Sequence, residues 1–194
     1  MFRLLPLFLL SLAACSGDDD TDTEIDTEAD TSVDTEADTE PDTEAPETCT
    51  YTSFVAGVEE FTYLTGYNAV FYTPVTSASH PNDGLNLELY FDIGASTGAH
   101  TYSFTSTDTL ADCHTCLTIA RDCSDVSTCS QQFLAQEGSV TFTSLVAEDG
   151  GALAGRFDAV VLHEITVDDQ GNSTLVEDGD TWCLDGYTFD GTLE

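Results

Sequence analysis

The chain has 194 residues, and its three Lys and Arg residues face 37 Asp and Glu residues, which gives a formal net charge of −34 at pH 7. Nucleic-acid binding through phosphate contacts needs clustered cations, so this composition excludes it. Like charge of this size also opposes self-association at low salt, and we expect a monomer.

The first 14 residues combine one arginine, an apolar segment and small residues at its end, the pattern of a secretory signal peptide. As a helix, residues 4–14 would extend only about 16 Å, too short for a hydrocarbon core of roughly 30 Å. The segment therefore predicts export and not a stable membrane span.

Leu12-Ala13-Ala14-Cys15 follows directly and resembles the lipobox of bacterial lipoproteins. The resemblance implies cleavage before Cys15 and acylation of its thiol with palmitate-type chains, so that the bilayer becomes a partner of the chain. Two or three acyl chains hold durably, whereas one holds weakly. Ser16 in place of Asp favours the outer membrane of the cell envelope. The alternative is ordinary secretion with an incidental thiol.

Residues 16–48 carry 15 acidic residues, no cation and no aromatic ring, with Asp-Thr-led tetrads running from 22 to 45. Such a segment cannot bury enough apolar surface to offset chain entropy, so it predicts a disordered acidic tether after the lipidated cysteine. Loose Ca²⁺ binding or sugars on its threonines are the alternatives to a solvated spacer.

Residues 49–194 have the size of one domain and a net charge near −20. Apolar and polar residues alternate in short runs between turn signals, which predicts an all-β, antiparallel sandwich or barrel-like domain. One face of a long strand is expected to hold Phe157, Ala159, Val161, His163, Ile165 and Val167. Further strands are expected at 50–56, 61–65, 68–75, 85–91, 99–105, 115–122, 130–136, 140–143 and 181–190.

Six cysteines remain in this domain, and an even number in an exported protein predicts disulfides. Cys49 and Cys183 would tie the two ends together. A hairpin that sets Ile119 against Phe133 would place Cys123 beside Cys129. The remaining pair is Cys113 and Cys116.

Other chemistry for Cys113-His114-Thr115-Cys116 stays open at this point. A redox centre usually opens a helix in a β-α-β context, which this sequence lacks. Zinc held by these thiolates and His114 is the other alternative, although an oxidising compartment favours disulfides.

No catalytic triad or nucleophile elbow occurs, and we expect no enzyme and no obligatory cofactor. Two acidic turns are weak candidates for Ca²⁺, which takes six to eight oxygen ligands. They contain Asp168, Asp169, Asp178 and Asp180.

The cysteine run from Cys113 to Cys129, with the later segments 133–140, 155–168 and 182–185, is similar to cysteine-rich β domains in lipoproteins of myxobacteria and related predatory bacteria. The resemblance covers roughly residues 85–190. It implies a surface lipoprotein and assigns no functional residue.

The sequence thus favours a lipid-anchored surface module for binding, adhesion or envelope structure, with an unknown partner. The alternatives are a Ca²⁺- or Zn²⁺-binding surface protein and a carbohydrate-binding or hydrolytic accessory. Exposed aromatic rings would form the sugar platform, namely those of Tyr63, Tyr67, Tyr72, Tyr90 and Trp182.

Overall fold

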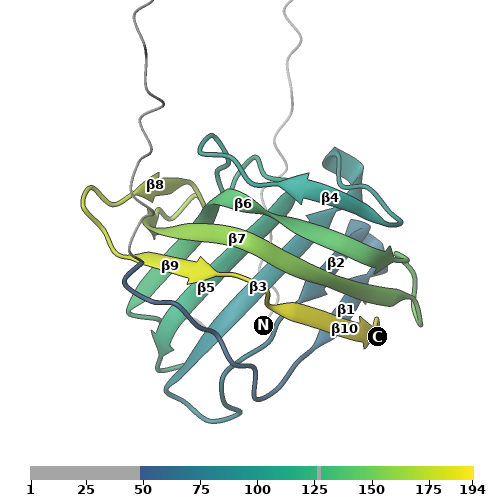
Figure 1. The fold of residues 1–194 in the computed structure, drawn as a ribbon, viewed down its shortest axis with the longest axis horizontal. Coiled ribbons are helices and arrows are strands. Elements are labelled where there is room, and N and C mark those ends of the chain that lie inside the picture. Colours follow the sequence, from purple (N-terminus) through teal and green to yellow (C-terminus); the bar gives the residue numbers. More distant parts are fainter. Residues whose placement is uncertain (1–48, 126–127) are drawn as a thin grey trace, which may run out of the picture. The chain divides into compact units, whose positions relative to one another are not determined.

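A computed structural model describes residues 49–125 and 128–194, and Figure 1 shows that they form one curled antiparallel sheet. The all-β prediction is confirmed. The expected signal peptide, the expected lipidation site Cys15 and the expected acidic tether lie outside the described residues. The elements are β1 Phe61–Leu64, η1 Thr65–Tyr67, β2 Ala69–Tyr72, β3 Asn82–Tyr90, η2 Phe91–Ile93, β4 His100–Ser103, β5 Thr115–Cys123, β6 Gln131–Leu145, β7 Ala152–Val167, β8 Ser173–Leu175, β9 Thr181–Leu184 and β10 Thr188–Thr192.

The main path of the sheet runs β1-β2-β3-β5-β6-β7-β10, with β4 on β6 and with β8 and β9 on β7. The two edges of this path meet at the C-terminus. Tyr63 N–H donates to the Glu194 carbonyl (3.0 Å), and Glu194 N–H donates to the Phe61 carbonyl (2.9 Å). The curled sheet is therefore barrel-like, which removes much of the exposed strand edge that an open sheet would present.

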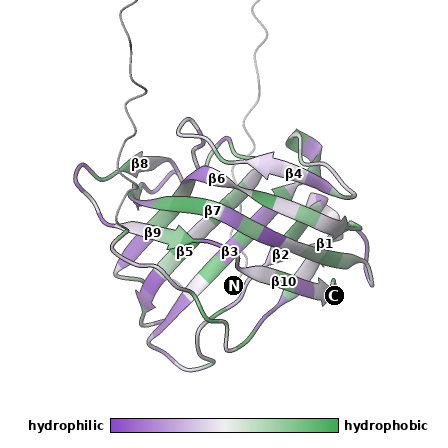
Figure 2. Ribbon diagram, viewed as in Figure 1, coloured by the Kyte–Doolittle hydropathy of each residue, from purple (hydrophilic) through white to green (hydrophobic). Residues whose placement is uncertain are grey.

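The interior of the curl is filled by apolar side chains from nearly every strand. Figure 2 shows apolar and polar residues alternating along the strands, as expected when one face is buried. A loop over residues 104–114 covers part of the outer face as well, since Leu110 N–H donates to Ser173 Oγ and Gln136 Nε2 donates to the Asp108 carbonyl. Beneath this loop, Leu134 and Ile165 are buried although they lie outside the main core.

The prediction for the buried face of the long strand is wrong beyond Phe157. Ala159 adopts a positive φ of 48°, and Val160 and Leu162 enter the core in place of Val161 and His163. A bulge adds one residue and so exchanges the two faces of everything that follows. His163 is consequently half-buried on the outer face and not a core histidine.

Several expected boundaries also change. The two short strands expected at 130–136 and 140–143 are one bulged strand, β6, and the strand expected at 181–190 is split into β9 and β10. The segment expected as a strand at 50–56 makes only one bridge, between Tyr51 and Trp182. The hairpin register that pairs Ile119 with Phe133 is confirmed.

Disulfides are present, as the sequence predicts, and they join Cys49 to Cys183, Cys113 to Cys116 and Cys123 to Cys129. Cys49 stands at the start of the domain and Cys183 lies in β9, so this bridge fixes the incoming chain to the sheet. Within the described ranges, no helix is long and apolar enough to cross a membrane.

Candidate functional site

A groove of about 640 Å³ lies on the outer face of β3 and β5, beside the segment that follows β2. We call it the outer groove. Its floor consists of two rows of side chains that run across the strands, and its wall is the loop before β3. The described residues that line it are Val58, Glu60, Thr73, Val75, Ser77, Ala78, His80, Asn82, Gly84, Leu85, Asn86, Thr118, Ala120, Cys123, Asp125 and Cys129.

The first row of the floor is polar and comprises Glu60, Thr73, Asn86 and Thr118. Strand pairing sets Asn86 directly opposite Thr118, and the β2–β3 register continues so that Thr73 faces Asn86 on its other side. Thr73 N–H donates to the Glu60 carbonyl at 2.9 Å, which places Glu60 at the end of the row. Four residues separated by up to 58 positions therefore lie side by side; we call them the polar row.

The second row of the floor is apolar. Val58 bridges to Val75, Val75 bridges to Gly84, and Gly84 pairs with Ala120. Gly84 carries no side chain to fill the space between Val75 and Ala120. We call Val58, Val75 and Ala120 the apolar row. It runs parallel to the polar row and is displaced from it by two residues along each segment, on the same face.

The wall of the groove is held by hydrogen bonds at both of its ends. Asn82 Nδ2 donates to the Ser77 carbonyl at 2.8 Å, which closes the loop on itself. His80 Nδ1 lies 2.9 Å from the Cys123 carbonyl, so the loop is also fixed to the end of β5. The groove is therefore a preformed concavity and not a gap between loose segments.

The amide of Asn86 is the unusual group in this groove. Its Nδ2 donates to Glu88 Oε1, which fixes the orientation of the amide, because the flipped amide would set two oxygens against each other. Oδ1 therefore points away from Glu88. It is buried and has no hydrogen-bond partner among the described residues. A buried acceptor without a partner costs roughly 1–3 kcal/mol, so such groups are rare. The oxygen is closed off from solvent, so a ligand in the groove does not reach it.

A smaller hollow of about 150 Å³ adjoins the outer groove and shares Thr118 and Ala120 with it. Glu88 lines this hollow and also accepts a hydrogen bond from the Tyr90 hydroxyl. That bond, together with burial as the larger cause, raises the pKa of Tyr90. The described lining of the two concavities holds carboxylates and no Lys or Arg, so the local charge is acidic.

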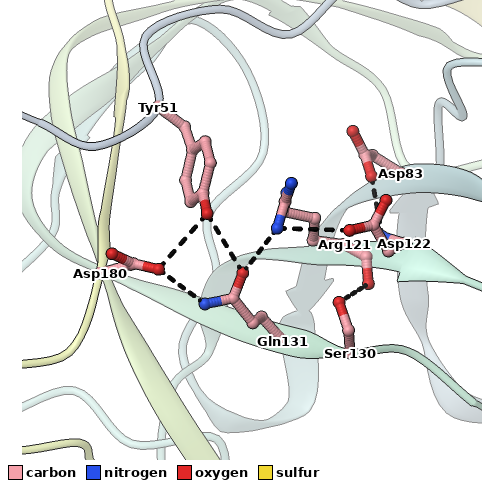
Figure 3. A network of polar contacts seen from close by, with 7 residues as sticks. All are labelled: Tyr51, Asp83, Arg121, Asp122, Ser130, Gln131 and Asp180. Atoms are coloured by element: carbon pink, nitrogen blue, oxygen red, sulfur yellow. Dashed lines mark hydrogen bonds and ion pairs between the residues drawn. The ribbon is translucent and has the colours of Figure 1, made fainter.

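A second polar cluster lies where the incoming chain meets the sheet (Figure 3). Tyr51 from the incoming segment points its hydroxyl at Asp180 Oδ2 and Gln131 Oε1, at 3.3 Å and 3.4 Å. Gln131 accepts from Arg121 Nη1 at 2.9 Å and donates to Asp180 at 2.8 Å. The hydrogen bond from Gln131 is the main cause that holds the pKa of Asp180 below its ordinary value. These side chains satisfy one another's hydrogen bonds within the cluster, so the network is structural.

The acidic turns that the sequence singled out do not form a metal site in the described residues, where no group of three His, Cys, Asp or Glu side chains converges. Asp168 Oδ1 accepts from the backbone of Gln170 and Asn172, and its Oδ2 accepts from the Asn172 amide. These bonds lower the pKa of Asp168 and close the turn between β7 and β8. Asp169 and Asp178 are exposed.

Cys113 and Cys116 form a disulfide, so they present no thiolate pair to zinc in this structure. His114 lies between them with its ring against Tyr102, at 5.0 Å between ring centres. His114 Nδ1 lies 3.2 Å from Thr115 Oγ1. The segment therefore packs the 104–114 loop onto the sheet.

The aromatic rings considered as a sugar platform do not gather in a groove. Tyr72 and Trp182 lie in the core, with exposed fractions of 0% and 3%. Tyr67 is exposed on η1 between β1 and β2, and Tyr63 and Tyr90 are half-buried in different strands. None of the five lines the outer groove.

Sequence reasoning did not find the outer groove. Its polar row draws Asn86 and Thr118 from the outward-facing positions of β3 and β5, and Glu60 and Thr73 from the residues next to β1 and β2. The pairing order of the strands brings them together, and no local motif signals that order. A scan against protein-family models, a search of curated proteins and a search of solved structures each find no match to this chain.

Proposed function

We propose that this chain is a lipid-anchored protein of the bacterial cell envelope whose β domain is a non-enzymatic binding module with the outer groove as its ligand site. The outer groove, a preformed concavity of about 640 Å³ with a polar and an apolar row on its floor, is the observation that carries the proposal. Small-molecule sites are usually concavities of this kind, in which a few polar groups lie beside apolar side chains.

The cysteine pairing supports the anchor. The three disulfides use all six cysteines after residue 48, so Cys15 is the one cysteine left for lipid. A tether with 15 acidic residues would then repel an anionic membrane surface and hold the domain off it, and Ser16 after the lipidated cysteine favours the outer membrane.

The anchor is tested by expressing the full chain in a bacterium that processes lipoproteins and partitioning it between detergent and water. The wild type should enter the detergent phase, and Cys15→Ser should remain in water. Ser16→Ala is the matched control, since it changes the neighbouring residue and keeps the thiol. Equal partitioning of wild type and Cys15→Ser would refute the anchor.

The binding role is tested on the mature chain by NMR, with a panel of amines, polyols, sugars and carboxylates. At least one class should shift the signals of Asn86 and Thr118 in a saturable way. The same samples, followed for a day, should show no chemical conversion of the bound compound. No groove shift with any class would refute the binding role, and turnover would refute the non-enzymatic assignment.

A further inference from the structure

We propose that Gly84 is the specificity-determining residue of the outer groove, and that the groove takes a linear aliphatic chain, free of anionic groups, across the β3 backbone at this position. This inference rests on the proposed binding role of the groove, and it names the chemical class of the ligand and the residue that admits it. A glycine that the fold does not require, an apolar row of matching length and the charge of the lining support it.

Gly84 lies in the interior of β3, where a glycine weakens the strand and often marks the close approach of a ligand or of another segment. The other glycines of the described strands each have a steric reason. Gly138 has a φ of +84°, and a Cβ on Gly155 or Gly191 would lie 2.7 Å or 2.4 Å from its nearest neighbour. Gly84 has neither reason. Its φ is not positive, and a Cβ would meet only Val75 Cγ1 at 3.7 Å, which is an ordinary van der Waals distance.

The irregular pairing beside Gly84 does not require a glycine either. Asn82 pairs with Cys123 and Gly84 pairs with Ala120, so two steps along β3 correspond to three steps along β5. The extra residue therefore lies on β5, where Asp122 has a φ of 49°. The fold would accept alanine at position 84, and the space above the glycine is left for another group.

The missing side chain leaves an open floor between Val75 and Ala120. Gly84 bridges to Val75 on one side and pairs with Ala120 on the other, and all three residues are half-buried and line the groove. Because Leu85 and Leu87 point into the core, a Cβ on Gly84 would point in the opposite sense to Leu85, into the groove. A ligand in the groove therefore packs directly on the β3 backbone at this point.

The apolar row gives the shape of the ligand. Val58, Val75, Gly84 and Ala120 are consecutive neighbours on four adjacent segments. Neighbouring strands lie about 4.8 Å apart, so this line extends over about 14 Å across the sheet. An extended chain of about ten atoms covers most of that length, since three bonds of an extended chain span about 3.5 Å. A linear aliphatic chain that follows the row crosses β3 at Gly84.

The lining disfavours other classes of ligand. Its acidic residues are Glu60 and Asp125, and no Lys or Arg is among the described lining residues, so anionic chains such as fatty-acid carboxylates are repelled. No Phe, Tyr or Trp ring is present in the described lining to stack on a sugar. Ca²⁺ needs six to eight oxygens from several charged groups, and the described residues hold no group of three convergent ligands.

The test of ligand class uses the mature full chain, with octane-1,8-diol as the probe and triethylene glycol as its counterpart. The two compounds have equal length and the same terminal hydroxyls, and they differ by two methylenes that become ether oxygens. The diol should shift the NMR signals of Gly84 and Ala120 in a saturable way. It should bind at least about tenfold more tightly than triethylene glycol, because each buried methylene contributes about fourfold.

Octanedioate has the same carbon chain with anionic ends. It should bind several-fold more weakly than the diol, and added salt should narrow the difference. Equal binding of the diol and triethylene glycol would overturn the aliphatic assignment, and tighter binding of octanedioate than of the diol would overturn the exclusion of anions.

Two variants test the role of Gly84. Gly84→Ala should weaken diol binding by about tenfold, since the added methyl group occupies the floor, and Gly84→Val should weaken it further. The urea midpoint of Gly84→Ala should stay unchanged or rise by about 0.3 M, because alanine restricts the unfolded chain. A lower midpoint for Gly84→Ala would show that the glycine is structural and would overturn the inference.

Gly66→Ala is the matched control, because Gly66 lies in η1 outside the described lining of the groove. Its φ is not positive, and a Cβ there would meet nothing within 4 Å. Diol binding should therefore be unchanged. If Gly66→Ala weakened binding as much as Gly84→Ala, the proposed site would be wrong.

The outcomes separate this inference from the binding role on which it rests. Diol binding in the groove that Gly84→Ala leaves unchanged would overturn the role of Gly84 and keep the groove as a binding site. Absence of any groove shift, with the diol or with any other compound tested, would overturn both.

Discussion

The guanidinium carbon of Arg121 lies 4.5 Å from the centre of the Tyr51 ring. This contact joins the incoming chain to the end of β5, at the same point where Cys49 is bonded to Cys183 in β9. The other face of the cluster is apolar, since Tyr51 also contacts the rings of Phe133 and Trp182. The entry of the domain is thus held by one covalent bond, one cation-π contact and a saturated polar network.

Arg121→Ala should lower the free energy of unfolding by about 1–2 kcal/mol, because it removes the cation-π contact and one donor to Gln131. Arg156→Ala is the matched control, since Arg156 is the other arginine of the domain and forms an exposed ion pair with Asp158 on the outer face. Exposed pairs contribute little, so this variant should change stability by less than about 0.5 kcal/mol. Urea unfolding of both variants measures the difference. Equal losses would mean that the Tyr51 contact adds nothing beyond surface charge.

The long-range disulfide between Cys49 and Cys183 and the short-range disulfide between Cys123 and Cys129 should differ in their effect on stability. The chain-entropy model gives about 5 kcal/mol for the loop closed by Cys49 and Cys183, with a separation of 134 residues, and about 2 kcal/mol for the loop of Cys123 and Cys129, with a separation of six. Replacing each pair by alanines and unfolding the variants in urea tests this order. A larger loss from the Cys123–Cys129 replacement would contradict it.

The sequence predicts the all-β class and the hairpin register because alternation and cysteine spacing are local signals. It fails where a bulge exchanges the faces of a strand, as at Ala159, since a positive φ at alanine leaves no trace in the pattern of apolar residues. It fails equally for the outer groove. Glu60, Thr73, Asn86 and Thr118 meet only because β1, β2, β3 and β5 pair in this order, and that order depends on the whole sheet.

Tyr72 should make the domain sensitive to alkali. Its side chain is fully buried, and its hydroxyl donates to Glu59 and lies 2.8 Å from the Tyr187 hydroxyl. Burial, followed by the bond to Glu59, raises the pKa of Tyr72 far above its ordinary value of 10.0. The unfolded chain therefore loses this proton first as pH rises. The stabilisation is complete below pH 10 and is lost as pH rises from there toward the folded-state pKa.

Tyr72→Phe should cost about 1 kcal/mol at pH 7 through the lost hydrogen bonds. Above pH 10 it should also reduce the slope of stability against pH by up to about 1.4 kcal/mol per pH unit, the equivalent of one proton. Tyr67→Phe is the control, because Tyr67 is 65% exposed. Urea unfolding between pH 7 and 11 gives both slopes. Parallel slopes for wild type and Tyr72→Phe would show that another group governs the alkaline transition.

Gly138 should be far less replaceable than Gly98, although the two have nearly the same φ angle. Their φ angles are +84° and +82°, so alanine meets a similar conformational penalty of about 1 kcal/mol at either position. Their surroundings differ. A Cβ on Gly138 would lie 2.3 Å from the Ala159 carbonyl oxygen and 2.5 Å from the Val160 Cα, whereas a Cβ on Gly98 meets nothing within 4 Å.

Gly138→Ala would therefore force β6 and β7 apart at the bulge that exchanges the faces of β7, and Val160 and Leu162 would be drawn from the core. We expect Gly98→Ala to lower the free energy of unfolding by about 1 kcal/mol and Gly138→Ala by more than about 3 kcal/mol, because backbone atoms cannot yield as a flexible side chain can. Thermal and urea unfolding of the two variants isolate the steric part, since the φ penalty cancels between them. Similar losses would mean that the β6–β7 contact is compliant and that the bulge is not fixed by the glycine.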